Sequence, residues 1–265
     1  SHIIANEKFG SVVTESGGGY TWYKNSRLNR ITSWQNSACS NIPSEIIYLK
    51  DIETKRAWSL GLNPMPDNKN YNVVYGFGYT KYIHKCDGIE QELEMFVPKE
   101  DSVKIQILKL KNMNLNRKKL KILYYIKPVL GEDEVKTYGY INLNYDKNNN
   151  IICAQNLILF YIIPFNFSFS FKNDVIYVSN SEKIKSYTGN KEFFFGNGNL
   201  SNPDAIKKPN LNYENSLGCK PCIAYEIEVE LESLSEKEII FMLGAEESII
   251  DSKNMAYKYS KIQNC

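Results

Sequence analysis

The sequence predicts an all-β fold built from antiparallel strands, and three observations support this prediction. Polar and apolar residues alternate with a period of two along several segments, as in strands with one buried and one solvated face. Turn-forming clusters recur at short spacing, at residues 146–150, 196–199 and 234–238. The chain has 19 Tyr among 265 residues, and tyrosine favours half-buried strands. Many short strands with regular turns indicate a sandwich or a barrel.

The individual strands follow from the alternating segments. These segments are residues 88–98, 118–128, 165–171 and 224–233. In each of them, apolar side chains occupy every second position, and Glu, Lys, Asn or Ser occupy the positions between. The glutamates of these rows are expected to face solvent rather than to form a catalytic pair. In residues 103–112 the apolar phase shifts between Ile107 and Leu108, which predicts a β-bulge or burial on both faces.

At most short helices are expected until residue 245, and a longer helical pattern is found only at the end of the chain. Residues 244–265 lose the alternation and gain Ala, Glu and Lys, with a ragged apolar stripe at Ile249, Ile250, Met255, Tyr259 and Ile262. We therefore divide the chain into a β domain over residues 1–247 and the start of a helical linker over residues 248–265.

Composition excludes several classes of function. A net charge of +2, from 32 basic and 30 acidic residues, argues against a nucleic-acid partner. The most apolar stretch, residues 156–171, is too short for a membrane span and is interrupted by Pro164. The start of the chain lacks a leader pattern, and six unevenly spaced cysteines do not form a disulfide framework. These features predict a reduced, cytoplasmic protein.

The other motifs do not indicate a redox, metal or catalytic site. The pair Cys219 and Cys222 has the spacing of a redox motif or of half a zinc site, but a second pair and a nearby histidine are lacking. A turn containing Pro221 explains the pair better. His2 and His84 are the only histidines, so a Ser-His-Asp arrangement is not credible. We expect no metal, no cofactor and no catalytic residue in this chain.

The segment "ESGGGYTWYKNSRLNR" (15–30) is the main candidate for a binding site. It lacks the Gly-Lys-Ser/Thr ending of a phosphate loop, and no helical pattern follows. Gly17, Gly18 and Gly19 are expected to form a tight structural turn. The candidate carbohydrate-binding or domain-interface residues after this turn are Tyr20, Trp22, Tyr23, Asn25 and Arg27, whereas Arg30 and Trp34 are expected to brace the turn. A hairpin corner with buried aromatics is the alternative explanation.

Several motifs, in order, also resemble a known family. The segment "NEKFGSVVTESGGGYTWYKNSRLNRITSW" (6–34) resembles the N-terminal β domain of glycoside hydrolase family ninety-four, formerly glycosyltransferase family thirty-six. The likeness continues through "YGFGYTKYIHKCDGIEQELEMFVP" (75–98), "SYTGNKEFFFGNGNLSNP" (186–203) and "FMLGAEES" (241–248). It is strongest to the cyclic β-1,2-glucan synthase and cellobiose phosphorylase group. The chain departs from the family pattern at Asp87, where a second histidine is expected, and at Leu60, where a proline is expected. Residues 157–171 also fit this pattern poorly.

The resemblance implies a large antiparallel super-sandwich similar to galactose mutarotase-like domains. It also implies that the catalytic acid and the phosphate site lie in a following (α/α)₆ barrel that is absent from these 265 residues. The leading hypothesis is thus a non-catalytic domain of an inverting glycoside phosphorylase that binds a gluco-oligosaccharide or β-glucan weakly, shapes the active site and helps to form a homodimer. A stand-alone carbohydrate-binding protein is the alternative. A third hypothesis is a mutarotase-like enzyme, which would need a histidine and a carboxylate in a cleft. Only one usable histidine, His84, argues against it.

Overall fold

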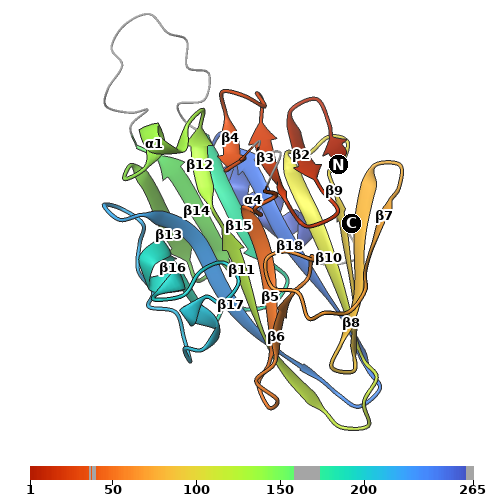
Figure 1. Cartoon of the computed structure of the whole chain (residues 1–265). Helices are drawn as coiled ribbons and strands as arrows, with labels where there is room; N and C mark the ends of the chain where they lie inside the picture. The colour runs from red at the N-terminus through yellow and green to blue at the C-terminus, as the bar shows by residue number, and fades with distance from the viewer. Residues whose placement is uncertain (36, 38–39, 158–173, 261–265) are drawn as a thin grey trace, which may run out of the picture.

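The computed structural model describes residues 1–35, 37, 40–157 and 174–260, and within these residues the strands form three antiparallel sheets (Figure 1). The largest sheet has eight strands in the order β13 (Ile141–Asp146), β14 (Ile151–Asn156), β15 (Val175–Asn180), β18 (Glu236–Glu246), β10 (Val103–Asn112), β9 (Ile89–Phe96), β8 (Tyr79–Cys86) and β7 (Tyr71–Tyr75).

The second sheet has five strands in the order β16 (Ser186–Asn190), β17 (Pro221–Leu231), β11 (Lys118–Ile126), β5 (Glu45–Asp51) and β6 (Ala57–Ser59). The third sheet is β1 (His2–Ala5), β2 (Phe9–Val13), β3 (Gly19–Tyr23), β4 (Arg30–Thr32) and β12 (Pro128–Gly131). Strands β2, β3 and β4 lie at the upper end of the molecule in Figure 1. One main core cluster takes apolar residues from all three sheets, so the sheets fold as one sandwich.

The predicted fold class is confirmed. Residues 88–98, 118–128 and 224–233 contain β9, β11 and β17, whose apolar positions supply much of the main core. The alternating segment 165–171 lies outside the described residues. Of the two explanations for the phase shift in residues 103–112, burial on both faces is correct: β10 pairs with β9 and β18 in unbroken register, while its first four residues are all buried.

One glutamate departs from the solvent-facing pattern. Glu226, predicted to be exposed on β17, is completely buried, 2.9 Å from Lys121 Nζ and 3.3 Å from Lys185 Nζ. The prediction was wrong because α3 (Lys191–Phe195) and η1 (Asp204–Ile206) contribute to a second apolar cluster on the outer face of this sheet. Period-two alternation identifies the two faces of a strand, but it does not show which face the rest of the chain covers.

Helices are short until residue 245 within the described chain, as expected: α1 (Glu134–Thr137), α3 and η1 are each one turn or little more. The last helix, α4 (Ile249–Tyr259), begins at the N-cap Ser248, whose hydroxyl accepts a bond from Asp251 N. Ala256 and Tyr259 of α4 are buried with β10, β14, β15 and β18 residues. The helix thus covers the outer face of the eight-stranded sheet, although its role as the start of a linker stays a prediction.

Candidate functional site

The glycine segment forms the tight connection between β2 and β3. Gly17 and Gly19 have positive φ angles of 93° and 130°. A Cβ atom on Gly19 would lie 1.9 Å from the Val12 carbonyl oxygen, so the backbone conformation and the space both require glycine here.

Two neighbouring loops hold this connection in place. The Asn41 amide donates hydrogen bonds of 2.6 Å to Thr14 Oγ1 and to Ser16 Oγ. On the other side, the Asn63 N–H donates to the Ser16 carbonyl at 2.9 Å. The glycine turn is therefore fixed by contacts with segments far away in the sequence.

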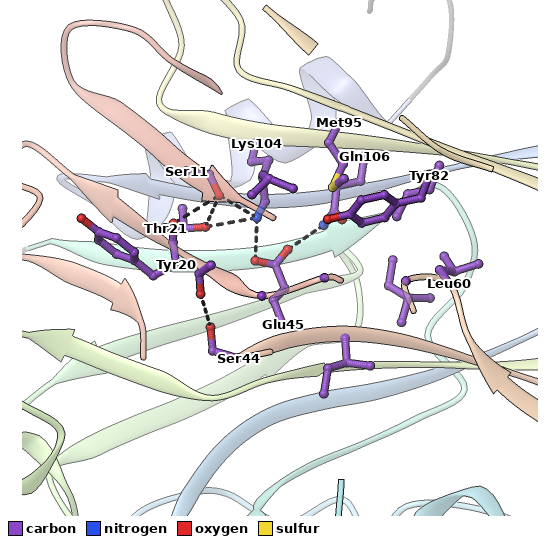
Figure 2. A pocket seen from close by; sticks show the side chains of 18 of the residues that line it. Ser11, Tyr20, Thr21, Ser44, Glu45, Leu60, Tyr82, Met95, Lys104 and Gln106 are labelled. Carbon is purple, nitrogen blue, oxygen red and sulfur yellow. Dashed lines mark hydrogen bonds and ion pairs between the residues drawn. The ribbon is translucent and has the colours of Figure 1, made fainter. Parts of the chain in front are cut away.

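A small cavity lies beside the glycine turn, between β2, β3, β5 and β10 (Figure 2). Its volume is about 50 Å³, and its polar wall is made by Ser11, Thr21, Glu45, Lys104, Gln106 and Tyr124. This is room for a few water molecules, and it is well below the roughly 300 Å³ at which ligand pockets begin. The cavity does not accommodate a sugar ring.

The polar wall is a network in which each group has a partner (Figure 2). Lys104 Nζ donates to Glu45 Oε2 at 2.6 Å, to Thr21 Oγ1 at 3.1 Å and to Ser11 Oγ at 3.3 Å. The other Glu45 oxygen accepts from Gln106 Nε2 at 2.8 Å and from the Tyr124 hydroxyl. The network thus ties β5, β10 and β11 to β2 and β3.

The geometry makes this network structural. Glu45 accepts bonds from three donors of the protein, so both of its carboxylate oxygens are already held by neighbouring side chains. Burial, together with the Glu45 charge, raises the pKa of Tyr124 well above its ordinary value, so this phenol stays protonated. The polar side chains of the cavity therefore serve to pair and hydrogen-bond the buried charges of Lys104 and Glu45.

A different surface lies on the outer side of β3. Tyr20 and Trp22 are two residues apart on this strand and share its outer face, where their ring centroids are 5.4 Å apart. Trp34 stacks on Tyr20 at 4.7 Å with an interplanar angle of 20°. The Arg30 guanidinium lies 5.6 Å from the Tyr20 ring and 5.9 Å from the Trp34 ring. We call Tyr20, Trp22, Trp34 and Arg30 the aromatic cluster.

The aromatic cluster is accessible to solvent. Trp34 is 37% exposed, and Tyr20, Trp22 and Arg30 are half-buried. Flat, partly exposed rings beside a guanidinium can stack on the apolar face of a sugar ring and bind its hydroxyls, or pack against another protein domain.

The structure separates the candidate residues that follow the glycine turn. Tyr23 is buried in the main core and is not available to a ligand. The Asn25 side chain accepts bonds from Arg27 N at 3.0 Å and Leu28 N at 2.8 Å, which shapes the β3–β4 turn. Arg27 is exposed and lies 3.9 Å from Glu132. Tyr20 and Trp22 alone among the five candidates belong to the aromatic cluster.

Arg30 and Trp34 were predicted to brace the turn, and their contact with Tyr20 was not predicted. Arg30 does bond the Ser26 carbonyl at 3.4 Å, as a bracing residue would. It also pairs with Trp22 across β3 and β4, which brings its side chain to the same face. A hairpin register between residues 22 and 30 is the signal that could have predicted this contact.

The cysteine pair is not a disulfide. Cys219 lies in the turn before β17, whereas Cys222 is buried within this strand, and both are free thiols. Cys86 and Cys153 are free as well. Among the described residues, every helix is too short or too polar to cross a membrane.

Comparison with known proteins agrees with the architecture. A family model described as the glycosyl hydrolase 94 supersandwich domain matches residues 1–262. The chain is 25% identical over 250 residues to the cyclic β-(1,2)-glucan synthase NdvB of Rhizobium meliloti, covering 92% of this chain and 8% of that protein. It is 30% identical over 115 residues to the N,N'-diacetylchitobiose phosphorylase of Vibrio furnissii, covering 42% of this chain and 14% of the phosphorylase.

Solved structures share the fold at low sequence identity. A bacterial glucoamylase solved with acarbose superposes with a TM-score of 0.58 at 12% identity, covering 96% of this chain and 32% of the glucoamylase. A putative aldose 1-epimerase of Escherichia coli K12 superposes with a TM-score of 0.51 at 6% identity, covering 92% of this chain and 98% of the epimerase. The three-sheet sandwich and the match over residues 1–262 lead to one conclusion: the chain belongs to the glycosyl hydrolase 94 supersandwich domain family.

Proposed function

We propose that this chain is the non-catalytic β domain of an inverting glycoside phosphorylase that acts on β-glucans, and that it shapes the active site and contacts the sugar. The observation that carries the proposal is the family match over residues 1–262 combined with the small share of the relatives that the chain spans. The chain covers 8% of the glucan synthase and 14% of the chitobiose phosphorylase. We place the catalytic acid and the phosphate site in a separate (α/α)₆ domain, joined through the segment from residue 248.

The site geometry supports a non-catalytic role. An inverting reaction needs an acid that protonates the leaving oxygen and a nucleophile on the opposite face of the sugar. Glu45, the carboxylate of the cavity, is held by three donors in a space too small for a sugar ring. The exposed aromatic cluster therefore supplies the contact surface, and we assign it to the edge that meets the catalytic domain and its sugar.

The test compares Tyr20→Ala and Trp22→Ala with the matched control Tyr257→Ala, an exposed tyrosine on α4. The chain is expected to bind gluco-oligosaccharides with a millimolar Kd, which corresponds to a binding free energy of about 4 kcal/mol. Tyr20→Ala and Trp22→Ala are expected to weaken this binding, whereas Tyr257→Ala is not. In the longer enzyme the same two changes lower phosphorolysis per folded molecule. If they lower thermal stability alone and leave binding and turnover intact, the glycine turn is a buried hairpin corner and the proposal is wrong.

The proposal includes a homodimer and a cytoplasmic location. The dimer follows from the family resemblance, and sedimentation of the longer protein tests it. The location is supported by the free thiols of Cys86, Cys153, Cys219 and Cys222, which suit a reducing compartment. Fractionation of the source cells tests the location.

A further inference from the structure

A second cluster of reactive side chains lies on β8, away from the glycine turn. His84 and Cys86 are two residues apart on this strand, so both point into the sandwich, and both are buried. Asp67, from the segment before β7, reaches the same place. One ligand atom from each of the three residues lies within 4.8 Å of the others.

The orientation of His84 is fixed by its neighbours. Its ring stacks on Tyr71 with centroids 3.7 Å apart and an interplanar angle of 4°. Its Nδ1 lies 2.9 Å from the Asn70 carbonyl oxygen. Since a carbonyl oxygen can only accept, Nδ1 carries a proton, and Nε2 is the ring nitrogen that faces Asp67. A carbonyl-bonded Nδ1 is the usual support of a metal-binding histidine.

Two atoms of this cluster lack a hydrogen-bond partner. His84 Nε2 and Asp67 Oδ2 are both buried, and neither makes a hydrogen bond. His84 Nε2 is 3.1 Å from the other carboxylate oxygen, Asp67 Oδ1, and the two side chains are 0% and 7% exposed. Buried polar atoms nearly always have partners, and here His84 Nε2 and the Asp67 carboxylate converge beside the Cys86 thiol. A bound cation would satisfy both.

We propose that Asp67, His84 and Cys86 bind one zinc ion. Imidazole nitrogen, thiolate sulfur and carboxylate oxygen together are a donor set that zinc accepts. In a tetrahedral site with ordinary zinc bond lengths, neighbouring ligand atoms are about 3.3–3.6 Å apart. The 3.1 Å between His84 Nε2 and Asp67 Oδ1 is already close to this value, and the Cys86 sulfur lies within 4.8 Å of both other ligand atoms. Binding forms the zinc–sulfur bond and releases the Cys86 thiol proton to solvent, and a water molecule completes the fourth position.

The zinc ion would act as a clamp. Asp67 belongs to the segment between β6 and β7, the same segment whose Asn63 N–H holds the Ser16 carbonyl of the glycine turn. Coordination would fix this segment to β8, and so would brace the glycine turn from the side opposite Asn41. The inference does not depend on the proposed sugar contact.

The test uses cobalt as a spectroscopic probe. The purified chain is stripped with a chelator and titrated with Co²⁺. A charge-transfer band from the thiolate to cobalt and the visible bands of a tetrahedral ion are expected to saturate at one equivalent, and Zn²⁺ is expected to displace them. Against a competing chromophoric chelator, Asp67→Asn, His84→Gln and Cys86→Ser each lower the zinc affinity at least about tenfold.

Controls separate this site from other thiols. Cys153→Ser removes a buried cysteine elsewhere in the sandwich, and Cys219→Ser removes the partly exposed one, and both are expected to keep the cobalt spectrum and the zinc affinity. The proposal is overturned if the unmodified chain gives no thiolate band with Co²⁺. It is equally overturned if the band persists in a folded Cys86→Ser chain or disappears in Cys219→Ser. The first outcome needs no variant, so misfolding of a variant cannot rescue the idea.

Discussion

Replacement of Lys104 by Met tests whether the buried network by the glycine turn holds the sheets together. Methionine keeps most of the length of the lysine side chain, so the change removes the ammonium group without opening a large cavity. Lys104 and Glu45 are 5% and 13% exposed, so water replaces few of the lost contacts. Three hydrogen bonds are lost, to Glu45, Thr21 and Ser11.

The expected loss of stability is about 3–5 kcal/mol, because removing one partner leaves the other charge buried without compensation. Gln106 and Tyr124 still donate to Glu45, so the lower part of this range is expected. That is a large share of the roughly 5–15 kcal/mol by which a domain is stable. The double variant Lys104→Met/Glu45→Gln removes both charges and is expected to recover part of the loss.

The assay is urea unfolding followed by circular dichroism, with the slope of the transition compared between variants. The control is Lys109→Met, a lysine on the same strand whose side chain is 44% exposed and pairs with Glu238, and which should cost less than about 1 kcal/mol. If Lys104→Met costs no more stability than this control, the ion pair does not stabilise the sandwich and the reasoning fails. The same holds if the loss in the double variant equals the sum of the losses in Lys104→Met and in Glu45→Gln alone.

Three further predictions concern other parts of the chain. Gly19→Ala should lower the free energy of unfolding by several kcal/mol, about twice the loss from the control Gly78→Ala. Gly78 has a φ of 85° but no atom within 4 Å of an added Cβ, so it tests backbone strain alone. Equal losses in the two variants would show that the contact with Val12 does not matter. Burial, with nearby carboxylates, raises the pKa of Glu246 from 4.5 to about 7. At Glu246 the folded state therefore binds more protons than the unfolded state between these pH values, so the contribution of this group to stability should fall by about 1–2 kcal/mol from pH 4.5 to pH 7. If a Glu246→Gln chain shows the same change of urea midpoint with pH as the unmodified chain, this contribution is absent. The chain alone should release no glucose 1-phosphate from a β-glucan and phosphate, and its detection by a coupled enzymatic assay would refute the non-catalytic assignment.

The sequence by itself determined the fold class and the core-facing side of β9, β11 and β17. In β9, β11 and β17 the period-two pattern is long and regular, and these strands supply apolar side chains to the main core as predicted. Such a pattern is a local property of the backbone, because successive side chains point to opposite faces. The order of several separate motifs also indicated the family, since their spacing reflects one shared architecture.

Tertiary structure alone decided which polar residues are buried and which distant side chains meet. Glu226 lies on the polar face of β17, yet α3 and η1 help to cover that face. Trp34 reaches Tyr20, and Asp67 reaches His84, only after hairpins and loops bring separate segments together. The physical reason is that burial and contact depend on what packs against a strand, and a period of two residues carries no information about the covering segment.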